Sequence, residues 1–330
     1  MTKTDSFLKN LTAQCQAQPG RVIFPEGDDP RVIEAAAKLI KWNAASEIIL
    51  ISASDGAGTR SKDTRQEVIS KNNCDLTKLT AEIFESAQKK KNKTVDADTL
   101  KSIATNPLYQ AGALLARESA DCVIAGCVAT TGDVIRAAIS TVGLAAGVKT
   151  VSGSFIMERT TNKKSEIYIY ADCGVVIEPT IEQLVDIAIG SCETYQKITR
   201  NDPVVAFLSF STKGSADHPA AHKMRSAAEL FKQRAPGIDS DGELQFDAAY
   251  VSDIGRRKAP DSNVSGRANC FIFPDLGAGN IAYKITQRLA GFAAYGPILQ
   301  GLAKPYSDLS RGASADDIAV SALINIIRSR

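Results

Sequence analysis

The sequence contains very little histidine. Among its 330 residues there are two, His218 and His222, four positions apart in the stretch DHPAAHKM. A zinc-binding HExxH helix needs a glutamate directly after the first histidine, where this chain has Pro219. The scarcity of imidazole therefore argues against a histidine-based metal site and against a Ser–His–Asp hydrolase.

Cysteine is present, but not in a pattern that supports a structural role. The chain has seven cysteines, an odd number, and no two of them have CxxC spacing. Disulfide frameworks and thiolate zinc sites both need regular cysteine pairs. We therefore predict neither of them, and no metal site of any kind.

The chain also lacks an excess of charge of either sign. It has 39 basic and 37 acidic residues, a formal net charge of +2. This balance gives no reason to expect a nucleic acid or a membrane surface as a partner. No run approaches the roughly 18 apolar residues of a membrane span, and the N-terminal stretch has no continuous apolar segment typical of a signal peptide. We expect a cytoplasmic protein that binds neither nucleic acid nor membrane.

Length and apolar patterning predict two α/β domains. A single core usually stops growing at roughly 250–300 residues. Short apolar runs alternate with stretches whose apolar residues recur every three or four positions, as in 29–43, 180–196 and 314–328. This alternation is typical of mostly parallel sheets with helices on both faces. The predicted strands are residues 21–25, 47–52, 121–126, 150–157, 166–172, 204–211, 244–251 and 270–276.

Two loops after predicted strands could bind an anion, because ligands of parallel sheets lie beyond the carboxyl ends of the strands. The stretch AGCVATTGDVIR places Thr130 and Asp133 at capping-box spacing, with Arg136 nearby. Capping and a surface ion pair would explain these residues without a ligand. The stretch SFSTKGS offers hydroxyls, Lys213 and a glycine, but it would equally serve as a polar turn.

Two further loops have the same ambiguity. The stretch PDLGAGN leads into a predicted helix that carries Arg288, and an ordinary strand–helix turn would look the same. The stretch KPYSDLSRGASADD joins Ser310 and Arg311 to a helix that Ser314 is expected to cap. Arg311 can bind a phosphate with two parallel hydrogen bonds, whereas Asp317 has the spacing of a second capping residue.

Several long stretches, taken together and in order, resemble the phosphate acetyltransferases of the phosphate acetyl/butyryltransferase family. The resemblance covers essentially the whole chain. Its segments are FPEGDDPRV, ADCVIAGCVATTGDVIR, GVKTVSGSFIM, FLSFSTKGSA, DGELQFDAA, FIFPDLGAGNIAYKITQRLAGF and GPILQGLAKPYSDLSRGASADD.

The resemblance implies a fold and an assembly. Members of this family are similar to isocitrate and isopropylmalate dehydrogenases, with two α/β/α domains, mostly parallel sheets and an interdomain cleft. Mapped here, domain one would comprise residues 1–147 plus 299–330, and domain two residues 148–298. The family is typically homodimeric, so a homodimer is expected.

The reaction implied is reversible: acetyl-CoA and phosphate give acetyl phosphate and CoA. By resemblance, thiolate attacks directly in a ternary complex, and no cofactor is needed besides the substrate coenzyme A. Asp317 would assist deprotonation of the thiol, Ser310 would hydrogen-bond the developing oxyanion, and Arg311 would hold the phosphoryl group.

The resemblance also implies residues that bind the substrates CoA, acetyl phosphate and phosphate. Arg136 and Arg288 would add positive charge. The walls of the anion site would be Thr130, Thr131, Ser211, Thr212 and Lys213.

The chain departs from the family pattern at two places. An arginine that often precedes the NPLY helix has no counterpart in FESAQKKKNKTV, where Lys89–Lys91 or Lys93 could replace it, and no role is assigned there. The family's usual cysteine after SRG is Ala313 here. Because the mechanism gives that cysteine no covalent role, we expect it to be dispensable.

Three other functions are considered. A phosphate butyryltransferase would perform the same chemistry on a longer acyl chain, although the DLSRG and STKGSA stretches favour the acetyl enzyme. A dehydrogenase on the related fold would need a metal-binding aspartate cluster and a dinucleotide site, and no GxGxxG follows the first strand. A non-catalytic relative would not need Ser310, Arg311 and Asp317.

Overall fold

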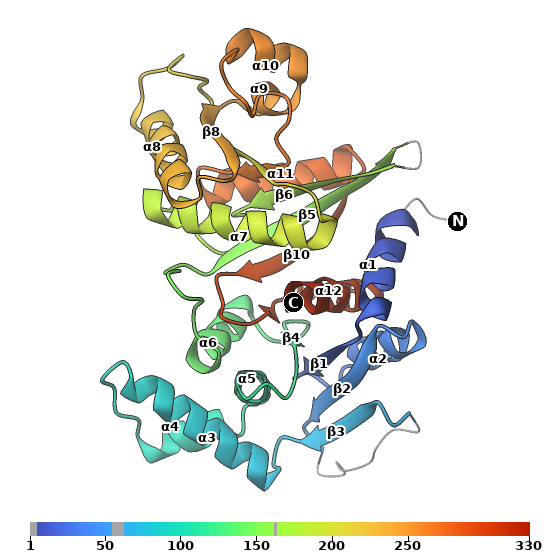
Figure 1. Cartoon of the computed structure of the whole chain (residues 1–330). Helices are drawn as coiled ribbons and strands as arrows, with labels where there is room; N and C mark the ends of the chain where they lie inside the picture. The colour runs from blue at the N-terminus through green and yellow to red at the C-terminus, as the bar shows by residue number, and fades with distance from the viewer. Residues whose placement is uncertain (1–4, 55–62, 162–163) are drawn as a thin grey trace. The chain divides into compact units, whose positions relative to one another are not determined.

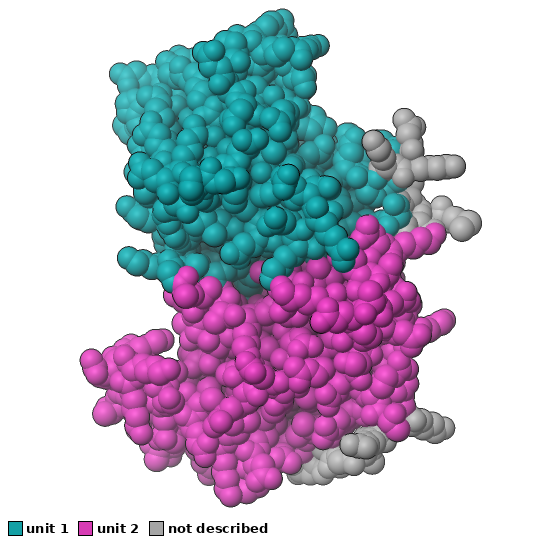
Figure 2. Space-filling model, viewed as in Figure 1, with its two compact units in different colours: residues 1–7, 147–301 teal, residues 8–146, 302–330 magenta. Residues whose placement is uncertain are grey.

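The computed structural model describes residues 5–54, 63–161 and 164–330. Two compact units are coloured separately in Figure 2. Unit 1 comprises residues 147–301 with the beginning of the chain up to Phe7, and unit 2 comprises residues 8–146 and 302–330. Whether these units are the domains expected from the sequence, with limits at 147 and 299, stays a prediction.

Unit 2 is built on a parallel sheet. Among the described residues, its strands follow the order β11-β4-β1-β2-β3, and each neighbouring pair is parallel. Val22, Ile23 and Phe24 on β1 are completely buried, as expected for a strand covered on both faces. The strands are β1 (Gly20–Phe24), β2 (Ala45–Ser52), β3 (Gln66–Ser70), β4 (Cys122–Ile124) and β11 (Tyr306–Ser307).

Helices cover both faces of this sheet (Figure 1). Helices α12 and α2 pack against each other and on the central strands, and α5 packs on the opposite face, flanked by α3 and α6. The C-terminal helix α12 buries eleven of its 14 residues. The helices are α1 (Asp5–Ala17), α2 (Pro30–Lys41), α3 (Cys74–Lys89), α4 (Ala97–Ala104), α5 (Pro107–Ala116), α6 (Thr131–Thr141) and α12 (Ala315–Arg328); the unit boundary after Phe7 falls inside α1.

Unit 1 has a mixed sheet. Within the described part of the chain its order is β10-β5-β6-β9-β7-β8. Strand β5 is antiparallel to both of its neighbours, β10 and β6, whereas the neighbouring pairs β6–β9, β9–β7 and β7–β8 are parallel. The strands are β5 (Ser152–Thr161), β6 (Lys164–Ala171), β7 (Val204–Leu208), β8 (Asp239–Leu244), β9 (Cys270–Ile272) and β10 (Ala293–Gln300).

The helices of unit 1 also lie on two faces. Helices α7 and α8 pack together on one face, and α11 packs against β10, β5 and β6 on the other (Figure 1). An aromatic core under α11 includes Phe155, Tyr170 and Phe271. The helices are α7 (Ile181–Thr199), α8 (Pro219–Arg234), α9 (Phe246–Tyr250), α10 (Ser252–Lys258) and α11 (Leu276–Leu289).

The predicted fold class is confirmed: both units are α/β, and most strand pairs are parallel. The helices expected at 29–43, 180–196 and 314–328 are α2, α7 and α12. Within the described residues, no helix is both long enough and apolar enough to cross a membrane.

One predicted strand is wrong. Residues 244–251 were expected to form a strand, but β8 ends at Leu244 and helix α9 follows. The actual strand, with the sequence DSDGEL, contains Asp241 and Glu243, whose side chains are almost fully buried. Cations from other elements neutralise both carboxylates, Lys213 and Lys232 on Asp241 and Arg225 on Glu243. No local pattern in the sequence reveals that compensation.

Candidate active site

The carboxyl ends of three adjacent strands in unit 2 meet at one edge of its sheet. Strands β11, β4 and β1 are neighbours and parallel. They lead through loops 308–314, 125–130 and 25–29 into helices α12, α6 and α2, whose N-caps are Ser314, Thr130 and Asp29. We call these three loops the carboxyl edge of unit 2. It collects three helix N-termini, each of which favours an anion.

The loop after β11 and the first turn of α12 present three predicted residues to solvent. Ser310, Arg311 and Asp317 are all exposed. The Ser310 hydroxyl accepts a hydrogen bond from the Gly312 amide at 3.2 Å, and its own proton has no acceptor among the described residues. The carbonyl oxygen of Arg311 accepts a hydrogen bond from Arg31, whereas its guanidinium has no hydrogen bond or ion pair in the described part of the protein. A hydroxyl donor and an unpaired guanidinium are thus available to a ligand.

Asp317 caps helix α12, as its spacing from Ser314 predicts. Its Oδ2 accepts hydrogen bonds from the Ser314 amide at 2.9 Å and from the Ser314 hydroxyl at 2.7 Å. The Ser314 hydroxyl in turn accepts from the Asp317 amide, which completes a capping box. Capping engages Oδ2, and within the described residues Oδ1 has no partner. The two roles considered for Asp317 are therefore compatible.

The predicted residues of α6 lie at the same edge. Thr130 caps the helix, and its hydroxyl donates to Asp133 at 2.8 Å. The Thr131 hydroxyl donates to Asp308 Oδ2 at 2.6 Å. Arg136 pairs with Asp133 at 3.3 Å, but its side chain is 65% exposed, so a stronger anion could displace that contact. Both threonine hydroxyls are engaged within the protein.

Asp308 is the first residue of the 308–314 loop, and its carboxyl group is buried. Only 1% of the residue is exposed, and its Oδ1 has no hydrogen-bond partner among the described atoms. Burial raises the pKa of Asp308 to about 6, although the hydrogen bond from Thr131 opposes the shift. A Cβ on Gly126 would lie 2.2 Å from Oδ1, so only glycine fits opposite this carboxyl.

Glu26 holds the loop that precedes α6. Its two carboxylate oxygens accept hydrogen bonds of 2.7–3.0 Å from four consecutive backbone amides, those of residues 126–129. The Cys127 thiol donates to the same carboxylate at 2.9 Å. Burial, followed by this contact, raises the pKa of Cys127 well above its ordinary value. Cys127 is therefore a protonated structural thiol rather than a nucleophile.

Sequence reasoning assigned no role to Glu26, Arg31 or Asp308, three residues that organise this edge. Their only signal was their position in the stretches FPEGDDPRV and DLSRG. A carboxylate that binds backbone amides leaves no pattern in the sequence, because its partners are main-chain atoms.

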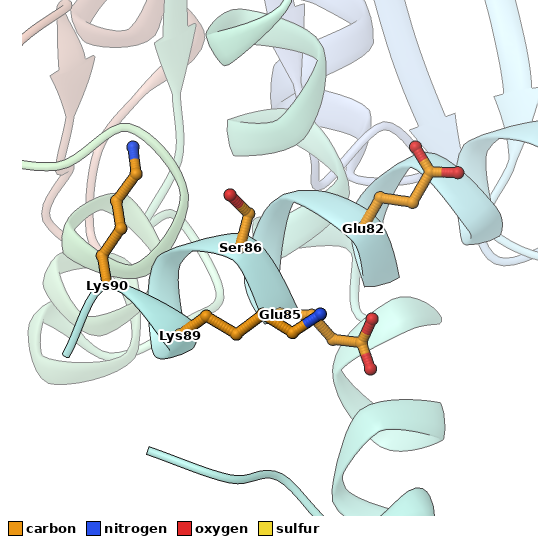
Figure 3. Close-up of a pocket in the computed structure, with 5 residues that line it drawn as sticks. All are labelled: Glu82, Glu85, Ser86, Lys89 and Lys90. Carbon is orange, nitrogen blue, oxygen red and sulfur yellow. The ribbon is translucent and has the colours of Figure 1, made fainter. Parts of the chain in front are cut away.

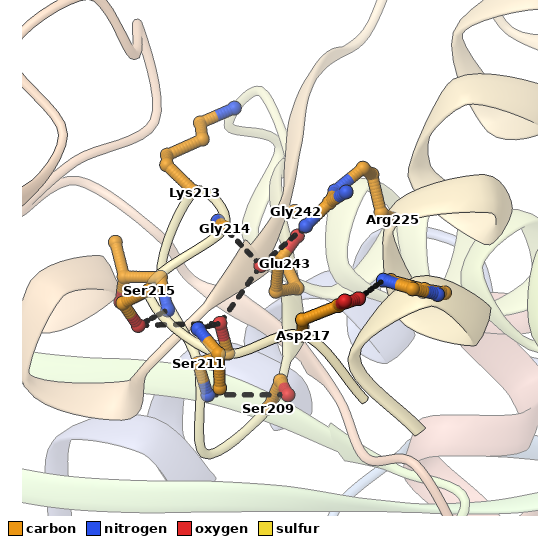
Figure 4. A network of polar contacts seen from close by, with 12 residues as sticks. Ser209, Ser211, Lys213, Gly214, Ser215, Asp217, Arg225, Gly242 and Glu243 are labelled. Atoms are coloured by element: carbon orange, nitrogen blue, oxygen red, sulfur yellow. Dashed lines mark hydrogen bonds and ion pairs between the residues drawn. The ribbon is translucent and has the colours of Figure 1, made fainter. Parts of the chain in front are cut away.

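The predicted loop of unit 1 follows β7 and is organised by Glu243 (Figure 4). The buried Ser211 hydroxyl donates to Glu243 at 2.9 Å, and the Gly214 amide donates at 2.8 Å. Arg225 donates twice to the same carboxylate, at 2.8 and 3.0 Å. Thr212 is also buried, and its hydroxyl accepts from the Gln245 amide at 2.9 Å. Both predicted hydroxyls thus maintain the loop.

Lys213 and Arg288 lie at different places in unit 1. The Lys213 ammonium pairs with Asp241 at 2.5 Å and is 40% exposed. Arg288 is in the last turn of α11, about 18 Å along the axis from the first residue of that helix, at ~1.5 Å per residue. The main strand contacts of α11 are with β10, β5 and β6. Within the described residues, no hydrogen bond or ion pair joins Arg288 to the loop of Ser211–Lys213.

The lysine-rich stretch without the family arginine lies at the end of α3. Lys89 is in the last turn of the helix, and Lys90 is its C-cap. Both border an open surface hollow together with Glu82, Glu85 and Ser86 (Figure 3). Two lysines and two glutamates leave this hollow without net charge, so it provides no argument for an anion site.

No cluster of three or more His, Cys, Asp or Glu side chains is placed to hold a metal ion in the part of the chain that the structure describes. The carboxyl edge of unit 2 thus combines helix N-termini, an exposed guanidinium, a hydroxyl donor and a carboxylate. Such a set can hold a phosphate and stabilise an oxyanion beside it.

Comparison with known proteins identifies the family. Residues 6–326 match the profile of the Phosphate acetyl/butaryl transferase family. The chain belongs to this family. A phosphate acetyltransferase of Paracoccus denitrificans is 39% identical over 326 residues, which cover 98% of this chain and 99% of that protein. The family resemblance predicted from the sequence is confirmed.

Solved structures agree with this family assignment. A phosphotransacetylase from Streptococcus pyogenes superimposes with a TM-score of 0.88 at 37% identity, covering 100% of this chain and 99% of that one. A putative 4-hydroxythreonine-4-phosphate dehydrogenase from Salmonella typhimurium is 12% identical, with a TM-score of 0.53, and covers 94% of this chain and 99% of that one. The second likeness concerns the fold alone and agrees with the predicted similarity to dehydrogenases.

The raised pKa of Asp308 predicts an unusual dependence of stability on pH. Below about pH 3, Asp308 is protonated in the folded and the unfolded chain. As the pH rises through 3.8 towards 6, the unfolded chain ionises while the folded protein retains the proton, so about 3 kcal/mol of unfolding free energy is lost, at ~1.36 kcal/mol per pKa unit. Asp308→Asn has no such loss, and its unfolding free energy should rise relative to that of the wild type by this amount between pH 3 and pH 7.

Urea unfolding of both proteins across this range measures the difference. If the unfolding free energies of wild type and Asp308→Asn differed by the same amount at every pH, the prediction would be contradicted.

Proposed function

We propose that this protein transfers an acetyl group reversibly between coenzyme A and inorganic phosphate. The observation that carries the proposal is the carboxyl edge of unit 2, where Ser310, Arg311 and Asp317 are exposed at one loop–helix junction. Near full-length similarity to phosphate acetyltransferases supports the acetyl group as the substrate. These names do not favour the alternative of a phosphate butyryltransferase.

In this proposal the thiolate of coenzyme A attacks the carbonyl carbon of acetyl phosphate directly. A new C–S bond forms, the C–O bond to phosphate breaks, and phosphate leaves with the electron pair. Asp317 accepts the thiol proton, since a thiol with a pKa near ~8.5 is mostly protonated at neutral pH. The Ser310 hydroxyl, whose proton has no acceptor among the described residues, donates a hydrogen bond to the oxyanion of the tetrahedral intermediate.

Arg311 holds the phosphoryl group with its planar guanidinium, and the N-terminus of α6 with Arg136 adds positive charge. Roles for Thr130 and Thr131 as walls of this anion site, and for Ser211, Thr212, Lys213 and Arg288 as further substrate contacts, stay predictions. Six of the seven cysteines are buried, and the exception is Cys74 at the beginning of α3. This distribution supports direct transfer without an acyl-enzyme.

The activity test mixes the purified protein with acetyl-CoA and adds phosphate. We expect CoA release that depends on phosphate, with kcat/KM higher for acetyl-CoA than for butyryl-CoA. Absence of release under these conditions would contradict the proposed function.

We further expect turnover without any cofactor or divalent metal, because Arg311, Arg136 and a helix N-terminus supply the positive charge that phosphate needs. The same assay after exhaustive treatment with a chelator measures this. Activity lost to the chelator and restored only by a metal ion would refute the expectation.

Asp317→Asn separates the two roles of Asp317. Asparagine keeps an oxygen for the Ser314 cap, so the melting temperature should change little. Loss of the base should lower kcat by roughly 10²–10⁴. The matched control is Asp316→Asn, an exposed neighbour that pairs with Lys38 at 2.7 Å and should keep wild-type kcat. Equal kcat in both variants would remove Asp317 from the reaction.

We also propose that the protein acts as a cytoplasmic homodimer. Helix α11 exposes Ile281, Ile285 and Leu289, which are 59%, 52% and 85% accessible and recur at every fourth residue. Ile177, whose carbonyl accepts from the Leu276 amide at the start of α11, is 71% accessible and extends this surface. We call these four residues the α11 stripe. An apolar stripe of this kind is stabilised when a second copy covers it.

Ile285→Asp should therefore produce monomers, because dimerisation would bury an unpaired carboxylate. The control is Ile33→Asp, which changes another exposed isoleucine on α2. Light scattering after gel filtration should give twice the 35.1 kDa chain mass for wild type and control, and the single mass for Ile285→Asp. A dimeric Ile285→Asp variant would contradict this interface.

A further inference from the structure

We propose that Arg31 is a positioning residue that holds the backbone of the 310–313 loop in its reactive conformation. The inference rests on the proposed function of that loop. Arg31 is the second residue of α2 and comes from a different strand–helix connection than the loop itself. Its side chain reaches main-chain atoms only, apart from the carboxylate of Asp29, so it takes no direct part in the chemistry.

All five N–H groups of the Arg31 guanidinium are used. Nη1 donates to the carbonyl oxygens of Arg311 at 2.8 Å and Ala313 at 3.0 Å. Nη2 donates to the Cys127 carbonyl at 2.9 Å and to Asp29 Oδ2 at 2.7 Å, and Nε donates to Asp29 Oδ1 at 3.0 Å. Since a guanidinium has five donors, this set is complete.

Asp29 fixes the direction of that guanidinium. The bidentate contact holds the plane of the Arg31 side chain, and the same carboxylate caps α2 through the Arg31 amide at 2.9 Å. The hydrogen bonds from the Arg31 guanidinium, followed by the one from its amide, lower the pKa of Asp29 despite partial burial, so the carboxylate is charged at neutral pH. The N–H groups of Arg31 that do not bond to Asp29 are therefore oriented before the 310–313 loop packs against them.

The Cys127 carbonyl, which accepts a hydrogen bond from Arg31, is also held in place. Cys127 belongs to the segment whose four amides bind Glu26, so its carbonyl is a stable anchor. Arg31 consequently joins the 310–313 loop to a segment that is held independently. With the carbonyls of Arg311 and Ala313 bound, the backbone that carries the exposed side chains of Ser310 and Arg311 is restrained, as transition-state stabilisation requires.

The chain offers a matched control for a purely structural ion pair. Arg21 pairs with Asp121 at 2.7 Å and donates to the Glu118 carbonyl at 2.8 Å. Its side chain is 37% exposed, against 33% for Arg31. Arg21 lies at the amino end of β1, the opposite edge of the same sheet. It therefore shares the chemistry of Arg31 without the proposed function.

The kinetic test compares Arg31→Lys with Arg21→Lys. Lysine keeps the charge but has three donors and no fork, so it cannot span Asp29 and three carbonyls. We expect Arg31→Lys to lower kcat by roughly 10–100-fold and to raise the KM for acetyl phosphate, with the KM for CoA within about twofold of wild type. Arg21→Lys should keep kcat within about twofold. Wild-type kcat in Arg31→Lys would overturn the proposal.

A second measurement does not depend on activity. Hydrogen exchange of the peptide spanning 310–313 should speed up in Arg31→Ala, whereas Arg21→Ala should leave that peptide protected. Millimolar guanidinium should partly restore kcat to Arg31→Ala, and it should have no effect on Arg21→Ala. Equal protection of 310–313 in both alanine variants, or no rescue, would overturn the proposal.

The two proposals can fail separately. If the wild-type protein releases no CoA in response to phosphate, the proposed function is wrong, and the exchange measurement still decides whether Arg31 anchors the loop. If the wild type is active and the Arg31 and Arg21 variants behave alike, the function stands and the positioning role is wrong.

Discussion

The contact between the Glu26 carboxylate and four consecutive backbone amides is the interaction on which the carboxyl edge of unit 2 depends. Amides in a tight loop cannot bond to one another, and leaving them unpaired in a protein interior costs about 1–3 kcal/mol each. One negative charge satisfies all four and defines the loop that leads into α6. The Cys127 carbonyl then becomes an acceptor for Arg31, and Thr131 is held where it can donate to Asp308.

Buried or half-buried carboxylates shape loops elsewhere in the protein by the same means. Glu243 receives a hydroxyl, an amide and a guanidinium from the segments around β7. Asp172 accepts the amides of Gly153, Gly174, Val175 and Val176. In each case a fixed anion substitutes for regular secondary structure as the partner of main-chain donors. Both units thus have loops that are ordered by a buried or half-buried carboxylate rather than by further strand pairing.

Much of this architecture could be predicted from the sequence, and the failures have physical causes. Apolar periodicity located α2, α7 and α12, because apolar residues recur every three or four positions in each of them. It missed β8, where the acidic residues Asp241 and Glu243 are neutralised by cations from distant segments. The exposed residues of the 310–317 segment came from family resemblance. Their support by Arg31 and Glu26 could not be predicted, since backbone carbonyls and amides are the same at every position.

The discontinuity of unit 2 has a consequence for synthesis on the ribosome. Its first segment ends at residue 146, and its missing edge strand and α12 arrive only after the 155 residues from 147 to 301 have been made. At ~5–20 residues per second this interval lasts roughly 8–30 s. Throughout it, the open edge of β4 and the sheet face that α12 later covers are exposed on the nascent chain. Unit 1 can complete its sheet first, so unit 2 finishes later although most of it is synthesised earlier.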